Sequence, residues 1–343
     1  MYSKNDLYLT SNDFSSFADI IYSDRQKYTE ELFNSNNEIV EYSKDEQFKH
    51  ITYKKLSFKI TSGDVIFCNT NQVDNLFYHL RKLSKIKDII LITHQTDKLI
   101  SKKDFQKKPS CIKKWLTVNT GYTDLNLHPI PIGVASNFSL KNLVPSDFQE
   151  FKIDNFKKNH VSLYINYQKN TNFSERSNLA ETFANNDWVD FDEPSLSKQD
   201  YMFKLANSSF VLCPWGNGID THRLWETLYM GSIPITKRHP TFNYKEKLPI
   251  LFVDDYSEVT FELLSNYLDN LELKNYNFDI LTKGYWKDYI ASMKSNNSYS
   301  EIIYEKKYIT SYFKWKRSYL HKLSSERKKV ITFYYKVRRL LRF

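Results

Sequence analysis

The chain has few of the residues and segments that mark several large classes of protein. Its 343 residues include only three cysteines, nine prolines and seven glycines. The cysteines, Cys68, Cys111 and Cys213, are odd in number and far apart, which excludes a disulfide framework and a zinc knuckle. We expect all three to be reduced thiols that pack as small buried side chains.

Long apolar runs are absent as well. No run approaches the roughly 20 residues that are needed to span a bilayer. Residues 1–14 are polar and mixed in charge, whereas a secretory signal places an apolar block after a basic segment. These absences predict a cytoplasmic protein.

A net positive charge is missing from most of the chain, although the formal total is +9. Residues 301–343 contain 13 basic and 3 acidic residues, a balance of +10, which leaves 36 basic and 37 acidic residues for positions 1–300. A protein that coats nucleic acid needs many Lys and Arg side chains along the contact, because its binding rests on counterion release. The neutral body therefore argues against nucleic acid as a partner.

The residues that are present indicate a globular α/β protein. Hydrophobic residues make up 41% of the chain and aromatic residues 16%, which excludes disorder. At about 150 residues per domain, the length suggests two domains. Short apolar runs alternate with amphipathic stretches, as in βαβ units around a parallel sheet. We predict two α/β domains that face each other across a cleft, with the boundary in the charged segment 144–160.

The same alternation predicts the individual elements. In the first half we expect strands within 62–69, 87–93 and 113–119 and a helix at 73–83. Residues 128–133 contain two prolines, so we expect a strand edge or a rigid turn there. In the second half we expect strands at 161–167, 188–191, 209–213, 233–237 and 250–252, and helices at 174–185, 197–207 and 260–271.

Three of the seven glycines, Gly216, Gly218 and Gly231, fall within sixteen residues. A strand leads into the first two, and Asp220 or Thr221 can cap the helix that follows. Free N–H groups at such a helix start, next to a glycine loop, favour a phosphate. The segment therefore predicts an anion-binding loop, and Gly231 predicts the C-terminal end of the helix.

Charged side chains follow the loop on the same helix. Arg223 lies near the helix start, where it can pair with a diphosphate, and Glu226 lies one turn further on, at i, i+4 from His222. A carboxylate at that depth can accept hydrogen bonds from a ribose. The alternative is an ordinary doubly wound domain in which Arg223 and Glu226 form an exposed ion pair worth under about 1 kcal/mol.

The segment 209–236 resembles the nucleotide-sugar-binding motif of exostosin-like glycosyltransferases. The motif has a strand, a loop with Pro and Gly, an Arg, a Glu and a Gly-x-x-Pro turn in this order, and two-domain fucosyltransferases have a similar arrangement. The resemblance is close over 197–236. It implies the GT-B fold, which has two Rossmann-like domains: here 1–150 would hold the acceptor and 158–290 the nucleotide sugar.

The resemblance also implies roles for single residues. Arg223 matches the Arg that contacts the diphosphate, and Glu226 matches the Glu that contacts the ribose. The loop residues implied to lie against the donor are Gly216, Asn217, Gly218 and Asp220, with His222 beside them. Arg176, after the strand that opens the second domain, matches a basic residue that reaches the diphosphate in similar enzymes; a solvated Arg on a helix face is the alternative.

The transfer needs a base, and the first domain offers two candidates. His94 and Asp97 follow a buried strand, and open α/β sheets carry their functional groups at that end. Either can take the proton from an acceptor hydroxyl as the nucleotide leaves. The alternative is that they cap the next turn.

One motif points to a metal instead. Asp190 and Asp192 have the Asp-x-Asp form that carries a divalent cation in the other main class of glycosyltransferase, but so short a pattern arises easily by chance. GT-B enzymes neutralise the diphosphate with Arg, a helix dipole and N–H groups. We therefore expect no metal and no cofactor besides the donor substrate.

The basic segment 300–343 has no proline or glycine after residue 300, which predicts a basic amphipathic helix. Such helices lie on anionic membrane surfaces, where each cation contributes about 1 kcal/mol. The alternative is a terminal helix that packs on the first domain with its charges solvated.

Together these features predict an inverting glycosyltransferase at the inner face of a membrane. It would move a sugar from a nucleotide sugar, preferably a UDP-sugar, to a hydroxyl of a surface glycan or lipid-linked oligosaccharide. One alternative is a phage-type DNA-modifying glycosyltransferase whose tail grips DNA. The other is a non-catalytic module that binds a nucleotide or glycan and lacks a base.

Overall fold

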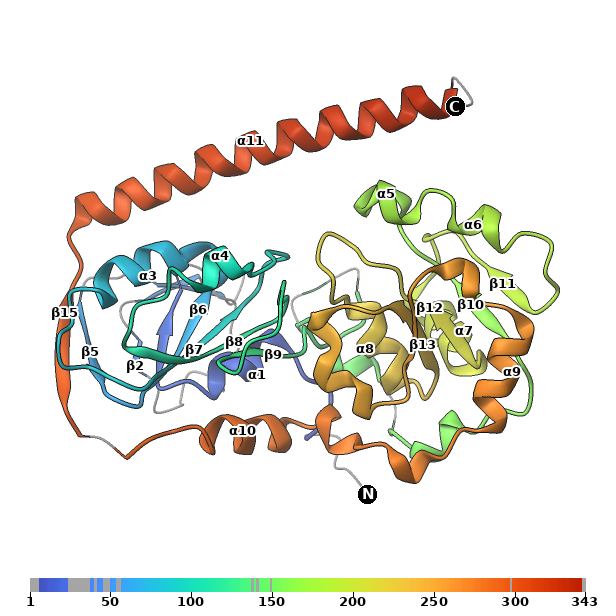
Figure 1. Ribbon diagram of the computed structural model, residues 1–343, viewed down its shortest axis with the longest axis horizontal. Coiled ribbons are helices and arrows are strands. Elements are labelled where there is room, and N and C mark those ends of the chain that lie inside the picture. Colours follow the sequence, from blue (N-terminus) through green and yellow to red (C-terminus); the bar gives the residue numbers. More distant parts are fainter. Residues whose placement is uncertain are drawn as a thin grey trace. The chain divides into compact units, whose positions relative to one another are not determined.

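The computed structural model has an α/β fold built on parallel sheets, in agreement with the sequence prediction (Figure 1). It describes residues 6–23, 38–39, 42–45, 50–53, 57–136, 139, 142–148, 150–296 and 298–340. The three cysteines are free and buried, as expected for packed thiols.

The contacts between residues divide the chain into two compact units, each made of separate stretches of sequence. The first unit comprises Met1–Phe17, Asp97–Phe105 and Leu116–Met293. The second comprises Ala18–Thr96, Gln106–Trp115 and Lys294–Phe343. These bounds differ from those of the domains predicted at 1–150 and 158–290, and that division stays a prediction.

A six-stranded sheet has the order β2-β1-β6-β7-β8-β9. Its pairs β1–β2, β1–β6 and β6–β7 are parallel, and the line between the two units falls inside β8. The strands are β1 (Ile20–Tyr22), β2 (Glu38–Ile39), β6 (Val65–Asn69), β7 (Ile89–His94), β8 (Ile112–Thr117) and β9 (Leu127–Pro129). As the two prolines predict, β9 is short and lies at the edge of the sheet.

Among its described residues, the second unit also contains two antiparallel strand pairs and two α-helices. Strand β3 (Tyr42–Asp45) pairs with β4 (His50–Tyr53), and β5 (Ser57–Thr61) pairs with β15 (Ser300–Tyr304). Helix α3 (Val73–Leu80) lies between β6 and β7 in the chain, and its apolar side chains are buried. It ends three residues before the predicted end at Leu83.

The first unit contains a five-stranded sheet in the order β11-β10-β12-β13-β14, and every neighbouring pair is parallel. Its strands are β10 (Leu163–Ile165), β11 (Val189–Phe191), β12 (Phe210–Leu212), β13 (Ile233–Lys237) and β14 (Leu251–Val253). The chain runs from β10 outward to β11 and then returns to β12 on the other side of β10. The strand order therefore reverses between β10 and β12, and such switch points are where open α/β sheets bind ligands.

Eight α-helices accompany the sheet among the described residues of the first unit. They are α1 (Ser11–Ser16), α4 (Lys102–Phe105), α5 (Phe173–Arg176), α6 (Leu179–Thr182), α7 (Lys198–Asn207), α8 (His222–Tyr229), α9 (Phe261–Asp269) and α10 (Lys283–Ala291). The single helix predicted at 174–185 was wrong, because α5 and α6 are separated at Ser177 and Asn178. Ser and Asn compete for backbone hydrogen bonds, which favours helix ends over helix interiors.

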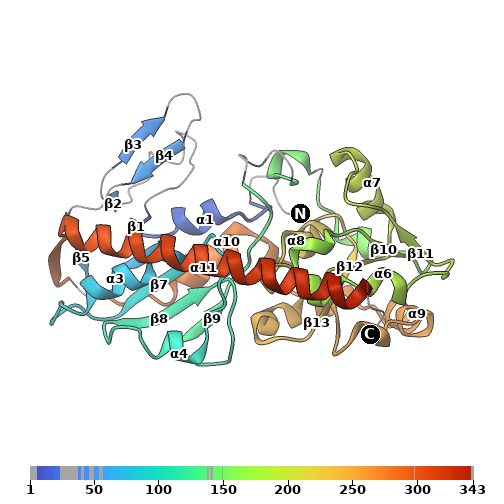
Figure 2. The same ribbon diagram turned by 90° about the horizontal axis from the view of Figure 1, so that it is seen from above.

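The second unit ends in α11 (Lys307–Leu340), which Figure 2 shows as one unbroken helix. Its first turns pack on α3: the Phe313 and Tyr78 rings lie 6.0 Å apart, and Lys316 Nζ lies 3.0 Å from Asp74 Oδ2. Within the described residues, no helix combines the length and the apolar content that crossing a membrane requires.

Candidate functional site

A pocket of about 270 Å³ lies in the first unit, beside the segments that follow β10 and β12. It therefore occupies the switch point of the five-stranded sheet. Of the ten site residues predicted from the sequence, nine line it: Asp97, Arg176, Gly216, Asn217, Gly218, Asp220, His222, Arg223 and Glu226. The tenth, His94, belongs to the second unit.

The loop after β12 is tightly folded and leaves little room for side chains. Gly216 N donates to Gly218 O at 3.0 Å, and Asn172 Nδ2 donates to Gly216 O at 3.0 Å. A Cβ on Gly218 would lie 2.9 Å from Asn119 Nδ2 and 3.3 Å from Asp97 Oδ1. Among the glycines that follow β12, a positive φ occurs at Gly231 (+73°). A glycine is needed at position 218 because Asn119 and Asp97 lie too close for a Cβ, not because the backbone has an unusual φ.

Arg176 holds this loop from α5. Its Nε donates to Trp215 O at 2.9 Å and its Nη2 to Pro214 O at 2.8 Å. The side chain is buried, so the alternative of a solvated Arg on a helix face was wrong. Burial lowers the pKa of the Arg176 guanidinium to about 10, and the nearby charge of Arg223 acts in the same direction. Arg176 therefore brings a buried positive charge to the wall of the pocket.

Arg223 adds a second positive charge from the first turn of α8. Its Nη2 donates to Asn166 Oδ1 at 3.4 Å, and its Nε is buried without a hydrogen-bond partner. In the part of the chain that the structure describes, neither Arg176 nor Arg223 forms an ion pair with a carboxylate. Two guanidinium groups that line one pocket favour an anionic ligand, although the charge of Glu226 acts on Arg223 as well.

Glu226 lies one turn further along α8 and is 5% exposed. Its Oε2 accepts a hydrogen bond from the Tyr201 hydroxyl at 3.0 Å. Burial raises the pKa of Glu226, against the opposing charges of His222 and Arg223. The alternative of an exposed Arg223–Glu226 ion pair was therefore wrong, and Glu226 is a buried hydrogen-bonding group in the pocket.

Asp220 takes part in a buried network that fixes the start of α8. Its Oδ2 accepts from Ile132 N at 2.9 Å, and its Oδ1 lies 2.7 Å from Lys245 Nζ, in the 3-10 helix Pro240–Lys247. Thr221 occupies the N-cap position of α8 but makes no capping hydrogen bond through its side chain. Neither predicted residue thus caps the helix, and its first N–H groups are left for another acceptor.

A backbone carbonyl that is distant in sequence, that of Gly133, holds the His222 ring in place. Its Nδ1 lies 2.7 Å from Gly133 O, and because a carbonyl only accepts, Nδ1 must carry the proton. Gly133 has φ of +68°, and a Cβ there would lie 2.1 Å from Leu9 O. Gly133, at the end of the segment 128–133 in which we expected a strand edge or a rigid turn, thus positions His222.

Sequence reasoning missed three residues that shape the site: Asn119, Gly133 and Lys245. Asn119 Oδ1 accepts from Ile219 N at 3.1 Å and from Asp220 N at 2.9 Å. Asn119 and Gly133 follow β8 and β9, so the rule that function gathers at the carboxyl ends of strands could have found them. Lys245 gave no such signal, because its partner is distant in sequence.

The two predicted bases differ in position. Asp97 is exposed and lines the pocket, close to Gly218. His94 is buried in the second unit, where its Nδ1 accepts from Gln95 N at 2.7 Å. Of the two, Asp97 is the group that reaches the residues described above.

The two carboxylates of the Asp-x-Asp motif, Asp190 and Asp192, form ion pairs with a lysine. Lys204 Nζ lies 2.5 Å from Asp190 Oδ2 and 3.6 Å from Asp192 Oδ2. Within the described residues, no group of three or more His, Cys, Asp or Glu side chains is placed to hold a metal ion. Lys204 thus supplies the positive charge beside these two carboxylates.

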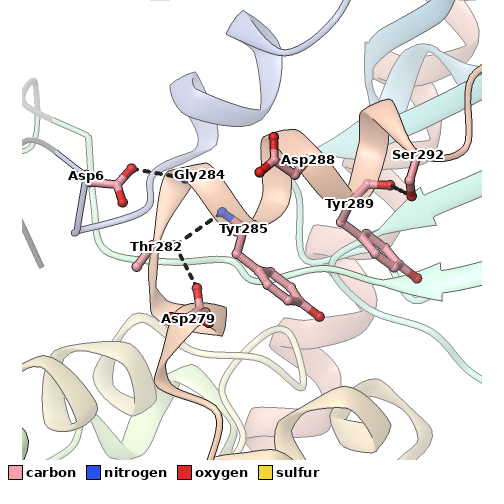
Figure 3. Close-up of a pocket in the computed structure, with 8 residues that line it drawn as sticks. All are labelled: Asp6, Asp279, Thr282, Gly284, Tyr285, Asp288, Tyr289 and Ser292. Atoms are coloured by element: carbon pink, nitrogen blue, oxygen red, sulfur yellow. Dashed lines mark hydrogen bonds between the residues drawn. The ribbon is translucent and has the colours of Figure 1, made fainter.

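A second pocket, of about 540 Å³, lies along α10 in the first unit (Figure 3). Three carboxylates line it, those of Asp6, Asp279 and Asp288, and no Lys or Arg is among its lining residues. The rings of Tyr285 and Tyr289 point the same way, with centroids 6.1 Å apart and planes 4° apart. Its acidic wall disfavours a phosphate, unlike the pocket beside α8.

A parallel α/β unit whose switch-point pocket combines two guanidinium groups with a helix start is suited to a phosphate-bearing ligand. Comparison with known families indicates the class of protein. Residues 166–335 match the family model of the RXYLT1 C-terminal domain. This family is related to xylosyltransferases and lies in the range of the exostosin-like glycosyltransferases, so the match supports a glycosyltransferase. The matched range includes Arg176, Arg223 and Glu226. No curated protein matches the chain significantly.

Proposed function

We propose that the protein is an inverting, exostosin-like glycosyltransferase of GT-B fold that uses a nucleotide sugar, preferably a UDP-sugar. Its acceptor is a hydroxyl of a surface glycan or of a lipid-linked oligosaccharide. The observation that carries the proposal is the pair of guanidinium groups, Arg176 and Arg223, which line one pocket and within the described residues form no ion pair with a carboxylate. Glu226 offsets part of the charge of Arg223, and the two negative charges of a diphosphate complement the two guanidinium groups.

We place the donor in this pocket with its diphosphate at the start of α8. Arg223 and the uncapped start of α8 bind the diphosphate, which also gains from the helix dipole. Glu226 accepts hydrogen bonds from the ribose hydroxyls. Gly216, Asn217 and Gly218 lie against the donor, while Arg176 and Asp220 keep the loop and helix start in place.

The reaction is a single displacement at the anomeric carbon. The acceptor oxygen forms a bond to that carbon as the bond to the diphosphate oxygen breaks, and the leaving nucleotide takes the electron pair. Asp97 accepts the hydroxyl proton. His94 is the second candidate base, but its buried ring already uses Nδ1 as an acceptor. Arg223, Arg176 and the helix start stabilise the leaving diphosphate, so the proposal involves no metal.

The enzyme works on the cytoplasmic side of a membrane, to which α11 attaches it peripherally. The helix exposes Tyr312, Trp315 and Tyr319, and the Trp315 and Tyr319 rings stack 5.7 Å apart. Aromatic side chains beside Lys and Arg suit the headgroup region of an anionic bilayer. A lipid-linked acceptor would be presented at the same surface.

Substitution of the two α8 residues tests the donor site. Arg223→Ala and Glu226→Ala should each lower UDP release from a UDP-sugar by roughly 10- to 100-fold, because each removes a charged hydrogen bond to the donor. Arg238→Ala is the matched control, since Arg238 is exposed and pairs with Asp254 at 3.5 Å. Turnover at the wild-type rate in both α8 variants would refute the donor-site assignment.

A further inference from the structure

His222 presents one ring nitrogen to the protein and the other to the pocket. Nδ1 donates to Gly133 O at 2.7 Å, which fixes the orientation of the ring. His222 lines the pocket, and within the described residues no hydrogen bond engages its Nε2. A histidine held in this way can accept a proton at Nε2, or donate one when both nitrogens are protonated.

The charged groups around His222 come from every wall of the pocket. Glu226 faces it from the next turn of α8, and Arg223 and Arg176 bring positive charge to the same pocket. Asp97 faces it from the segment after β7, and the charge of Asp220 is compensated by Lys245. Carboxylates and guanidinium groups therefore both lie around the ring, and a bound diphosphate adds negative charge beside it.

We infer that His222 binds the diphosphate of the donor as an imidazolium and takes up its second proton when the nucleotide binds. This inference rests on the proposed function. His222 and Arg223 both lie in the first turn of α8 and line the same pocket, so a diphosphate on Arg223 is placed within reach of His222. Nε2–H then donates to a phosphate oxygen, while Nδ1–H stays on Gly133 O.

The role of His222 in the reaction follows from the negative charge that the leaving phosphate gains. As the bond between the anomeric carbon and the diphosphate oxygen breaks, the electron pair goes to the phosphate, which gains one negative charge. The proton on Nε2 stays in the hydrogen bond and stabilises that charge. The proton of the acceptor hydroxyl leaves in the other direction, to the base.

Calorimetry of UDP binding at about pH 8 tests the inference. The terminal phosphate of UDP titrates near pH ~6 and is therefore already ionised at that pH. Titrations in two buffers of different ionisation enthalpy give the number of protons taken up on binding. The wild-type protein should take up close to one proton more than His222→Asn, whose amide can keep the Nδ1-like hydrogen bond to Gly133 O but has no group at Nε2.

The same experiment includes a matched control and a dependence on pH. His160→Gln changes an exposed histidine of the first unit that does not line the pocket, and it should bind UDP with the wild-type proton uptake. An imidazolium contact is complete at low pH and is lost as the ring deprotonates. The wild-type advantage in UDP affinity over His222→Asn should therefore be roughly 10- to 100-fold near pH 6 and should shrink toward pH 9.

Each outcome bears on one of the two proposals. Equal proton uptake by wild type and His222→Asn, with a loss of turnover alone, would make His222 the general base and overturn the inference. Absence of UDP binding by the wild-type protein would instead refute the proposed function. Unfolding temperatures of the variants show whether each one is folded.

Discussion

Lys245 and Asp220 form an ion pair whose side chains are both fully buried next to the pocket. Lys245 Nζ also lies 4.6 Å from the centre of the Phe242 ring and 4.9 Å from that of Trp225. Burial lowers the pKa of Lys245 to about 8, although the charge of Asp220 opposes that shift. This pair fixes the Asp220 carboxylate, and Asp220 in turn fixes the residues at the start of α8. A residue without any sequence signal thus supports the site.

Removing one partner of this pair should destabilise the protein strongly. Lys245→Met leaves the Asp220 carboxylate buried and uncompensated, and such changes cost about 3–5 kcal/mol. Lys157→Met is the control, because Lys157 pairs with Asp154 at the surface, where a pair contributes about 1 kcal/mol or less. Urea unfolding followed by tryptophan fluorescence measures both. Equal losses in the two variants would contradict a supporting role for the buried pair.

At the scale of elements, α8 organises the site. It presents His222, Arg223 and Glu226 to one pocket, because residues at i and i+4 share a face and the first turn lies at the loop. The helix ends as predicted: Gly231 adopts φ of +73°, and a Cβ there would lie 2.3 Å from the Asn155 Cβ. Its start differs from the prediction, because the Asp220 side chain is used in packing rather than in capping.

The exposed aromatic side of α11 should bind anionic bilayers. The full chain should sediment with vesicles that contain phosphatidylglycerol, and Trp315→Ala with Tyr319→Ala should weaken this binding by roughly tenfold or more, because two apolar rings no longer enter the headgroup region. Phe203→Ala is the control, since Phe203 is an exposed aromatic residue on α7. Binding to duplex DNA but not to vesicles would instead favour the DNA-modifying alternative.

For the whole molecule, the sequence predicted local secondary structure better than it predicted which distant residues contact one another. The strand β13 coincides with its prediction, because a short apolar run between a glycine and a charged segment defines a strand by itself. The pocket residues Arg223 and Glu226 were found because they follow a recognisable strand–loop–helix order. Asn119 and Lys245 were not, because each contacts residues that are distant in the chain. Spacing within a segment carries no information about such contacts.

The bounds of the two units were difficult to predict for the same reason: they depend on contacts between distant segments of the chain. The first unit combines Asp97–Phe105 and Leu116–Met293 with the N-terminal segment, so residues from both predicted domains line one pocket. A weak pattern at 144–160 indicates a change of segment but does not say which segments pack together. Long-range packing decides that, and it depends on side-chain fit rather than on periodicity.

The most direct test of the central claim is a crystal structure of the protein with UDP bound. We predict that the diphosphate lies within hydrogen-bond distance of the Arg223 guanidinium and of the first N–H groups of α8, with the ribose hydroxyls on Glu226. A diphosphate bound away from Arg223, such as in the acidic pocket along α10, would contradict it.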